Sequence, residues 1–192
     1  LCDLRDRVLD NAHLVRHRLV LDLKAGSGLI TWEALRRVPE GGVYALARSG
    51  RDADALNQLA GQLSEAERPI ILQGDLTALP ELLAAQDGPP RFDALVGHNV
   101  LVDLADKGAA VARMAALLAP GGTISLAERI PRHTQRLYKL LEMGDAALPA
   151  PLVERLVAAE EAIYTRSDDP LVSWDADTLG ELWEATGLRV EL

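Results

Sequence analysis

Two glycines that follow a short apolar run are the residues whose type and spacing point to chemistry most clearly. Residues 19–23 read as a strand, and Gly26 and Gly28 separate it from an amphipathic segment that begins at Leu29. Glycine lets the backbone approach a ligand closely, and the first N–H groups of a helix lack intrahelical partners. A strand, turn and helix of this kind is suited to hold a nucleotide-like ligand. Taken alone, the two glycines also fit a tight strand-to-helix connection.

Other reactive side chains give weaker indications. Asp93 begins a predicted strand, away from the end where ligands bind in such sheets, so a structural role is favoured. Glu128 follows a strand at the ligand end, where a solvated loop carboxylate is the simpler interpretation. The histidines lack carboxylate partners at metal-site spacing, and Cys2 is the single cysteine. We therefore expect no metal site and no intrachain disulfide.

The composition favours one α/β domain over residues 1–192. Hydrophobic residues make up 48% of the chain and aromatic residues 4%, so we expect one core of aliphatic side chains. A net charge of -9 opposes a broad electrostatic grip on nucleic acid. No apolar stretch reaches the roughly 18 residues of a membrane span. We expect a cytoplasmic protein with no membrane partner and no direct nucleic-acid contact.

Five short apolar runs alternate with helical patterns along the first two thirds of the chain. This alternation predicts a mostly parallel central sheet with crossover helices on both faces. Pro120 and the two glycines after it are expected to end the helix that precedes the fifth strand. The five runs cover residues 20–23, 43–47, 70–72, 92–96 and 123–126.

The alternation stops after the fifth strand. Residues 130–174 are expected to form a helical insertion of two helices. Asp175 or Asp177 is expected to cap a further helix that Gly187 closes, and residues 188–192 look like the start of a sixth strand. The chain lacks an initiating Met and stops on that strand. We therefore interpret it as a fragment of a longer protein whose C-terminal strand is missing.

The segment from Asp22 to Gly28 is similar to the D-x-G-x-G-x-G turn of the class I S-adenosylmethionine-dependent methyltransferases. The resemblance spans nearly the whole chain and implies a Rossmann-like methyltransferase fold that binds S-adenosylmethionine. It implies that Asp22 helps to anchor the methionine part of the cofactor beside Gly26 and Gly28. Lys24 stands where the family prefers its first glycine. A long cation there would either crowd the sulfonium cofactor or meet its carboxylate.

Three later segments strengthen the resemblance. Residues 73–76 are similar to the family's G-D segment, which implies that Asp75 accepts a hydrogen bond from the adenine amino group. Residues 92–101 resemble the fourth-strand motif that ends facing the transferred methyl group. Residues 117–123 match the L-x-P-G-G turn that leads into the fifth strand. Together these segments are fairly specific for the fold, and none of them proves catalysis.

The end of the second predicted strand departs from the family. An Asp or Glu there accepts hydrogen bonds from both ribose hydroxyls, whereas this chain has Ala47 followed by Arg48. Neither side chain accepts a hydrogen bond. The loss of one charge-assisted contact of roughly 1.5–3 kcal/mol would weaken cofactor binding by about one to two orders of magnitude. This departure is the strongest argument against a working enzyme.

His98 and Asn99 lie where a methyltransferase of this kind could orient its acceptor. A ring nitrogen or an amide there can bond to, or deprotonate, the accepting group. A simple turn after the fourth strand, with Asn99 bonded to local backbone, explains the pair equally well. The acceptor itself does not follow from the sequence.

Two other interpretations remain open. A dinucleotide-binding site is disfavoured, because Thr31 replaces the third glycine of G-x-G-x-x-G and Ala47 again lacks the ribose acid. Residues 32–42 are similar to methyltransferase-like modules appended to bacterial AAA+ ATPases of the replication and recombination factor group. That similarity implies a non-catalytic regulatory or interaction module, fused to an ATPase domain outside these residues. The present chain has no G-x-x-x-x-G-K-[ST] phosphate loop of its own.

Overall fold

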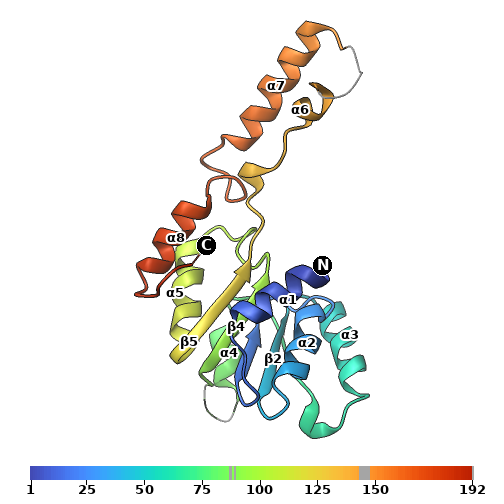
Figure 1. Ribbon diagram of the computed structural model, residues 1–192, viewed down its shortest axis with the longest axis vertical. Coiled ribbons are helices and arrows are strands. Elements are labelled where there is room, and N and C mark those ends of the chain that lie inside the picture. The colour runs from blue at the N-terminus through green and yellow to red at the C-terminus, as the bar shows by residue number, and fades with distance from the viewer. Residues whose placement is uncertain (87, 89, 143–147, 192) are drawn as a thin grey trace. The chain divides into compact units, whose positions relative to one another are not determined.

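A parallel β-sheet forms the centre of the computed structural model, which describes residues 1–86, 88, 90–142 and 148–191 (Figure 1). Within these residues the sheet has five strands in the order β3-β2-β1-β4-β5. Every neighbouring pair is parallel, so the predicted α/β fold with a mostly parallel sheet is confirmed. The strands are β1 (Leu19–Asp22), β2 (Gly42–Ala47), β3 (Ile70–Gln73), β4 (Phe92–His98) and β5 (Leu118–Ala127).

Helices flank the sheet, as the alternation of patterns predicted. In the described ranges no helix is both long and apolar enough to cross a lipid bilayer. The α-helices are α1 (Cys2–Asn11), α2 (Leu29–Arg37), α3 (Gly50–Ala60), α4 (Leu79–Ala84), α5 (Lys107–Leu117), α6 (Leu137–Glu142), α7 (Ala150–Tyr164) and α8 (Ala176–Glu184). Single 3-10 turns occur at Glu65–Glu67 and Pro131–His133.

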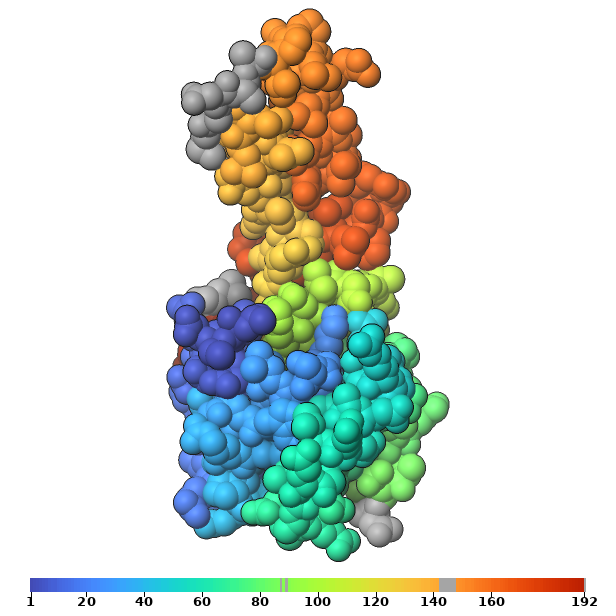
Figure 2. Space-filling view, turned by 90° about the vertical axis from the view of Figure 1, so that its right-hand side faces the viewer, coloured from blue at the N-terminus to red at the C-terminus, as the bar shows by residue number. Residues whose placement is uncertain are grey.

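The core under α1 and α2 is aliphatic, as the scarcity of aromatic residues predicted. Leu9 from α1 and Ala34 from α2 are fully buried and belong to one cluster with Val20, Val43 and Val96 of the sheet. Alternate residues of a strand point to opposite faces, so these valines all present the same face to the helices. The space-filling view shows the first three helices covering this side of the molecule, from dark blue to teal (Figure 2).

The chain divides into two compact units. One comprises Leu1–Val100 with Ala109–Glu128 and contains the whole sheet. The other comprises Leu101–Gly108 with Arg129–Leu192 and contains α6, α7 and α8. The expectation of a single domain over residues 1–192 stays a prediction.

The second unit contains the predicted helical insertion as α6 and α7. The expected cap of the next helix is also confirmed, because Asp175 accepts a hydrogen bond from the Thr178 N–H (3.0 Å). Thr178 Oγ1 in turn accepts from the Asp175 N–H (2.9 Å). In the same unit the buried ammonium of Lys107 donates to the carbonyls of Leu104 and Pro170, and this ties two loops together.

Two predictions about strands were wrong, namely the start of the fifth strand and the existence of a sixth. β5 begins at Leu118, five residues earlier than the apolar run suggested, because Leu118 pairs with Phe92 before the ladder shifts register. Pro120 and the glycines after it therefore lie within the strand as an irregularity, and Gly121 adopts a φ of 75°. Residues 188–191 form no strand, since they pair with no other strand in the described part of the chain.

Candidate functional site

The carboxyl ends of β1 and β4 mark the place where the strand order reverses. From β1 the chain builds the sheet towards β2 and β3, and it then crosses back to place β4 and β5 on the other side. In parallel α/β sheets such a switch point leaves a crevice beyond the strand ends, where ligands bind. We call the last residues of β1, β2, β3 and β4, together with the segments that follow these strands, the carboxyl edge. The edge brings together the predicted site residues Asp22, Lys24, Gly26, Gly28, Asp75, His98 and Asn99.

Asp22 is fully buried and ties the turn to the helix that follows. Its Oδ2 accepts a hydrogen bond from Thr31 Oγ1 (2.7 Å), and its Oδ1 accepts from the Lys24 N–H (3.2 Å). Burial raises the pKa of Asp22 to about 6, against the lowering effect of these hydrogen bonds. The carboxylate therefore fixes the start of the turn after β1 to the first turn of α2. The sequence did not reveal Thr31 as its partner, although a hydroxyl in the first turn of α2 was the available clue.

Lys24 links the two strands at the switch point. Its ammonium donates a hydrogen bond to the carbonyl oxygen of Asn99 (2.6 Å), which directly follows β4. Asn99 adopts a left-handed conformation with a φ of 53°, which asparagine tolerates better than most residues. The Asn99 N–H donates to the carbonyl of Ala127 at the end of β5 (2.8 Å). The two roles predicted for Lys24 were contacts with the sulfonium or the carboxylate of a cofactor, and this bond to the protein's own backbone was not predicted.

The two glycines of the turn have different surroundings. Both have positive φ values, 50° for Gly26 and 84° for Gly28. A Cβ on Gly28 would lie 2.3 Å from Trp32 Nε1 and 2.7 Å from Leu56 Cδ2, so that position is closed by packing. A Cβ on Gly26 would meet only the Lys24 carbonyl oxygen, at 4.0 Å. Gly26 is thus the open point of the turn, where a ligand can approach the backbone.

The end of β2 is apolar and closed. Ala47 has no exposed surface and packs in a cluster with Ala25, Ala45 and Leu56, against which Trp32 also lies. Its carbonyl oxygen accepts a hydrogen bond from the Gly74 N–H (2.9 Å), which fastens the end of β2 to the end of β3. The side chain at position 47 therefore offers no acceptor to a ribose, and the loss of the ribose contact stays a prediction.

Asp75 follows β3 on the exposed surface of the edge. Its Oδ1 accepts hydrogen bonds from Thr77 Oγ1 (2.5 Å), the Thr77 N–H (2.8 Å) and the Ala78 N–H (3.1 Å). These bonds, and to a smaller extent the charge of Arg48, hold the pKa of Asp75 below its usual value. Asp75 is therefore a fixed, ionised acceptor beside the end of β2.

The remaining candidate carboxylates have structural partners. Asp93 accepts from the Leu19 N–H (2.8 Å) and from Arg18 Nη1 (3.0 Å), which confirms its structural role. Glu128 is half-buried, and its Oε1 accepts from the Val100 N–H (2.7 Å). The interpretation of Glu128 as a solvated loop residue was therefore wrong, because this carboxylate holds the segment that follows His98 and Asn99. Among the described residues no three potential metal ligands gather at one place.

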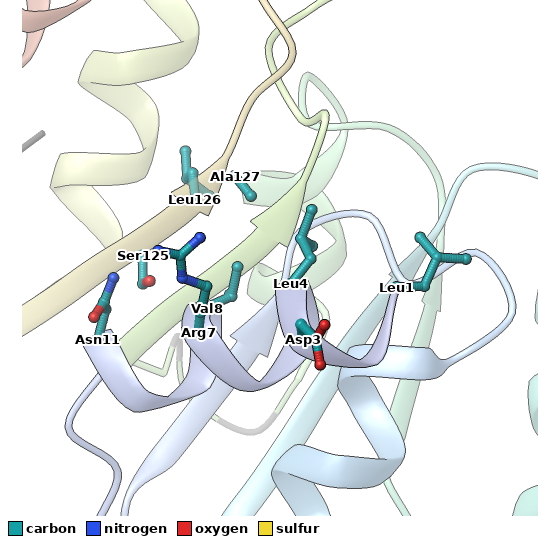
Figure 3. Close-up of a pocket in the computed structure, with 9 residues that line it drawn as sticks. All are labelled: Leu1, Asp3, Leu4, Arg7, Val8, Asn11, Ser125, Leu126 and Ala127. Atoms are coloured by element: carbon teal, nitrogen blue, oxygen red, sulfur yellow. The ribbon is translucent and has the colours of Figure 1, made fainter.

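A separate open hollow of about 470 Å³ lies between α1 and β5 (Figure 3). Its polar lining comes mainly from Asp3, Arg7 and Asn11 of α1, with Ser125 of β5 opposite. At one side it is lined by Ala127, the last residue of β5. None of the predicted site residues lines it.

Comparison with protein families and with curated proteins finds no match. Solved structures do match. The mycolic acid cyclopropane synthase CmaA1, complexed with SAH and CTAB, aligns over 97% of this chain and 60% of its own, with a TM-score of 0.65 and 17% identity. The chain has the methyltransferase fold. Coclaurine N-methyltransferase, bound to N-methylheliamine and SAH, aligns over 65% of this chain and 34% of its own, with a TM-score of 0.55 and 14% identity.

The YcgJ protein from Bacillus subtilis aligns over 96% of this chain and 67% of its own, with a TM-score of 0.61 and 15% identity. The present chain spans about a third to two thirds of the length of these three proteins. At such identities the comparisons establish the fold, and the roles of individual residues stay predictions.

Proposed function

We propose that this chain binds S-adenosylmethionine at the carboxyl edge and is a domain of the methyltransferase type. The observation that carries the proposal is the open backbone at Gly26, directly beside the switch point of a methyltransferase fold. An added Cβ would occupy space there that no side chain of the turn fills. The turn therefore fits a ligand that must lie against the backbone.

The roles of the residues follow from their donors and acceptors. Gly26 would let the ligand lie against the turn that Asp22 holds in place from below. Asp75, ionised and exposed, would accept a hydrogen bond from the adenine amino group. His98 would orient the methyl acceptor beside Asn99, whose backbone is fixed by Ala127. When bound, S-adenosylmethionine supplies a methyl group on a positively charged sulfur, and alignment with an acceptor accounts for the rate of transfer.

Calorimetric titration tests the binding step directly. We expect SAH, the demethylated product, to bind with a Kd in the micromolar to submillimolar range, weakened about tenfold or more by the lack of an acceptor at Ala47. If no heat of binding is detected at about 5 mM SAH, the proposal is overturned, because this concentration is well above the expected Kd.

A matched pair of glycine variants localises the site. Gly26 and Gly121 both have positive φ values, and a Cβ on either would meet no atom closer than 4.0 Å. Gly26→Ala and Gly121→Ala should therefore cost similar backbone strain. Only Gly26→Ala should weaken SAH binding, by about tenfold, because its methyl group obstructs the approach to the backbone. Equal binding by both variants would contradict a site at the turn.

The closed apolar end of β2 favours a second candidate, a module that keeps the fold without transferring a methyl group. A regulatory or interaction role within a longer protein, such as one with an AAA+ ATPase domain, would need no acceptor at Ala47. This candidate expects the double variant Lys24→Gly, Ala47→Asp to gain cofactor affinity without gaining activity. Absence of any gain in the titration would count against it.

A further inference from the structure

The bond between Lys24 and Asn99 fixes a positive charge at the switch point of the sheet. The ammonium lies 2.6 Å from the Asn99 carbonyl oxygen and so joins the segments after β1 and β4. At both ends of this link the backbone N–H donates a hydrogen bond that holds the residue in place. The Lys24 N–H bonds to the buried carboxylate of Asp22, and the Asn99 N–H bonds to Ala127.

The side chain of Lys24 comes from the turn that contains Gly26, the open point for a ligand. Only one residue separates the two, and Lys24 is half-buried there. The lysine charge is therefore screened less than that of a fully exposed side chain. A ligand that lies on the turn must share this part of the edge with the ammonium.

We propose that Lys24 is a specificity-determining residue that makes the carboxyl edge prefer an uncharged adenosyl thioether over a positively charged sulfonium. The inference rests on the proposed function, because it concerns the same ligand site. The ammonium opposes a second positive charge by Coulomb repulsion, and it also occupies a carbonyl acceptor that could otherwise receive a cationic group of the ligand. The repulsion acts against S-adenosylmethionine more strongly than against its product, because only S-adenosylmethionine carries a positive charge on sulfur.

The two ligands isolate this charge. S-adenosylmethionine and SAH share the adenosine and the amino acid part, and they differ by one methyl group and one positive charge on sulfur. Repulsion between charges a few ångströms apart at a partly buried site changes affinity by roughly tenfold. The ratio of the two dissociation constants therefore reports the effect of Lys24, whereas the absolute affinity reports the site as a whole.

The experiment measures both dissociation constants by calorimetry for the wild type and two variants of Lys24. We expect the wild type to bind SAH about tenfold more tightly than S-adenosylmethionine. Lys24→Met, which removes the charge and keeps the length, should bring the ratio close to one by improving the binding of S-adenosylmethionine. Lys24→Arg should keep the ratio of the wild type.

Arg68→Met is the matched control, because it removes one exposed cation just before β3, at the opposite end of that strand. Its ratio should equal that of the wild type. Thermal unfolding of each variant shows that it is folded before titration. If Lys24→Met does not fold, Lys24→Gln replaces it as the neutral variant.

The outcomes separate the two proposals. Binding of both ligands with the same ratio in the wild type and Lys24→Met would overturn the role of Lys24 and leave the binding site standing. Weaker binding of both ligands to Lys24→Met would also overturn it, since the lysine would then be a partner of the ligand carboxylate. If neither ligand binds detectably to the wild type or to any variant, the proposed function is overturned, and the inference with it.

Discussion

The ends of β1 and β2 lie side by side in the sheet, yet they have opposite chemistry. β1 ends in the carboxylate of Asp22, which is buried and hydrogen-bonded to Thr31 and to the backbone of Lys24. β2 ends in Ala47, which is equally buried but lies in an apolar cluster. The methyltransferases that the sequence resembles have an acidic residue at both places, whereas this chain has one only at the end of β1.

This difference distinguishes Asp22, which stabilises the turn itself, from an acid at position 47, which would contact only a ligand. Asp22 satisfies two donors of the protein itself, so its loss would damage the turn even without a ligand. An acid at position 47 would have no such task, because the end of β2 is already fastened to β3 by the Gly74 N–H. The fold can therefore be stable without an acid at position 47, whereas it requires Asp22.

The largest effect should come from removing the acceptor at the end of β1. Asp22→Ala leaves the Lys24 N–H and the Thr31 hydroxyl without their partner in a buried place. Its free energy of unfolding should be about 3 kcal/mol lower than that of Asp22→Asn, which keeps the shape and an acceptor. Chemical denaturation of both variants measures the difference. Equal stability would mean that Asp22 does not build the turn.

The pH dependence of stability tests the burial of the same carboxylate. The pKa of Asp22 is about 6 in the folded state, against an ordinary value of 3.8. Between these two values the folded state binds more protons than the unfolded state, so this group lowers the free energy of unfolding as the pH rises from about 4 to 6. The fall amounts to roughly 3 kcal/mol for a shift of this size.

Asp22→Asn should lack this fall. Denaturation of the wild type and the variant at a series of pH values measures it, and the stability of the variant relative to the wild type should increase across that window. A constant difference from pH 4 to 7 would show that Asp22 titrates in the folded state as it does in an exposed position.

A smaller effect distinguishes the two glycines of the turn. Gly28→Ala should lower the free energy of unfolding by about 2–3 kcal/mol, because its Cβ meets Trp32 and Leu56. Gly26→Ala should cost only about 1 kcal/mol, the strain of a positive φ in open space. Thermal or chemical denaturation compares them. The reverse order would contradict the assignment of Gly26 as the open point.

The fold could be predicted from the sequence because its signals are local. Apolar runs separated by helical patterns define the parallel strands, and parallel strands place the residues after them at one edge. This is why Asp22, Lys24, Gly26 and Asp75 lie at the same edge, while their role in binding stays a prediction. The cap at Asp175 was readable for the same reason, because its partner is three residues away.

The partners of these residues could not be predicted, because they depend on distant segments. Lys24 bonds to a carbonyl 75 positions further along, and Glu128 bonds to an N–H 28 positions before it. The early start of β5 depends likewise on pairing of Leu118 with Phe92. Residues 188–191 show the converse, since their composition is typical of a strand but they pair with no strand among the residues that the structure describes.

The most direct test of the account follows backbone amides by NMR while SAH is added to isotope-labelled protein. Binding at the carboxyl edge predicts saturable shifts for the amides of Gly26, Asp75 and Asn99, and unchanged amides for Val8 and Asn11 beside the hollow between α1 and β5. Shifts confined to that hollow, or none at about 5 mM SAH, would contradict a ligand site at the switch point of the sheet.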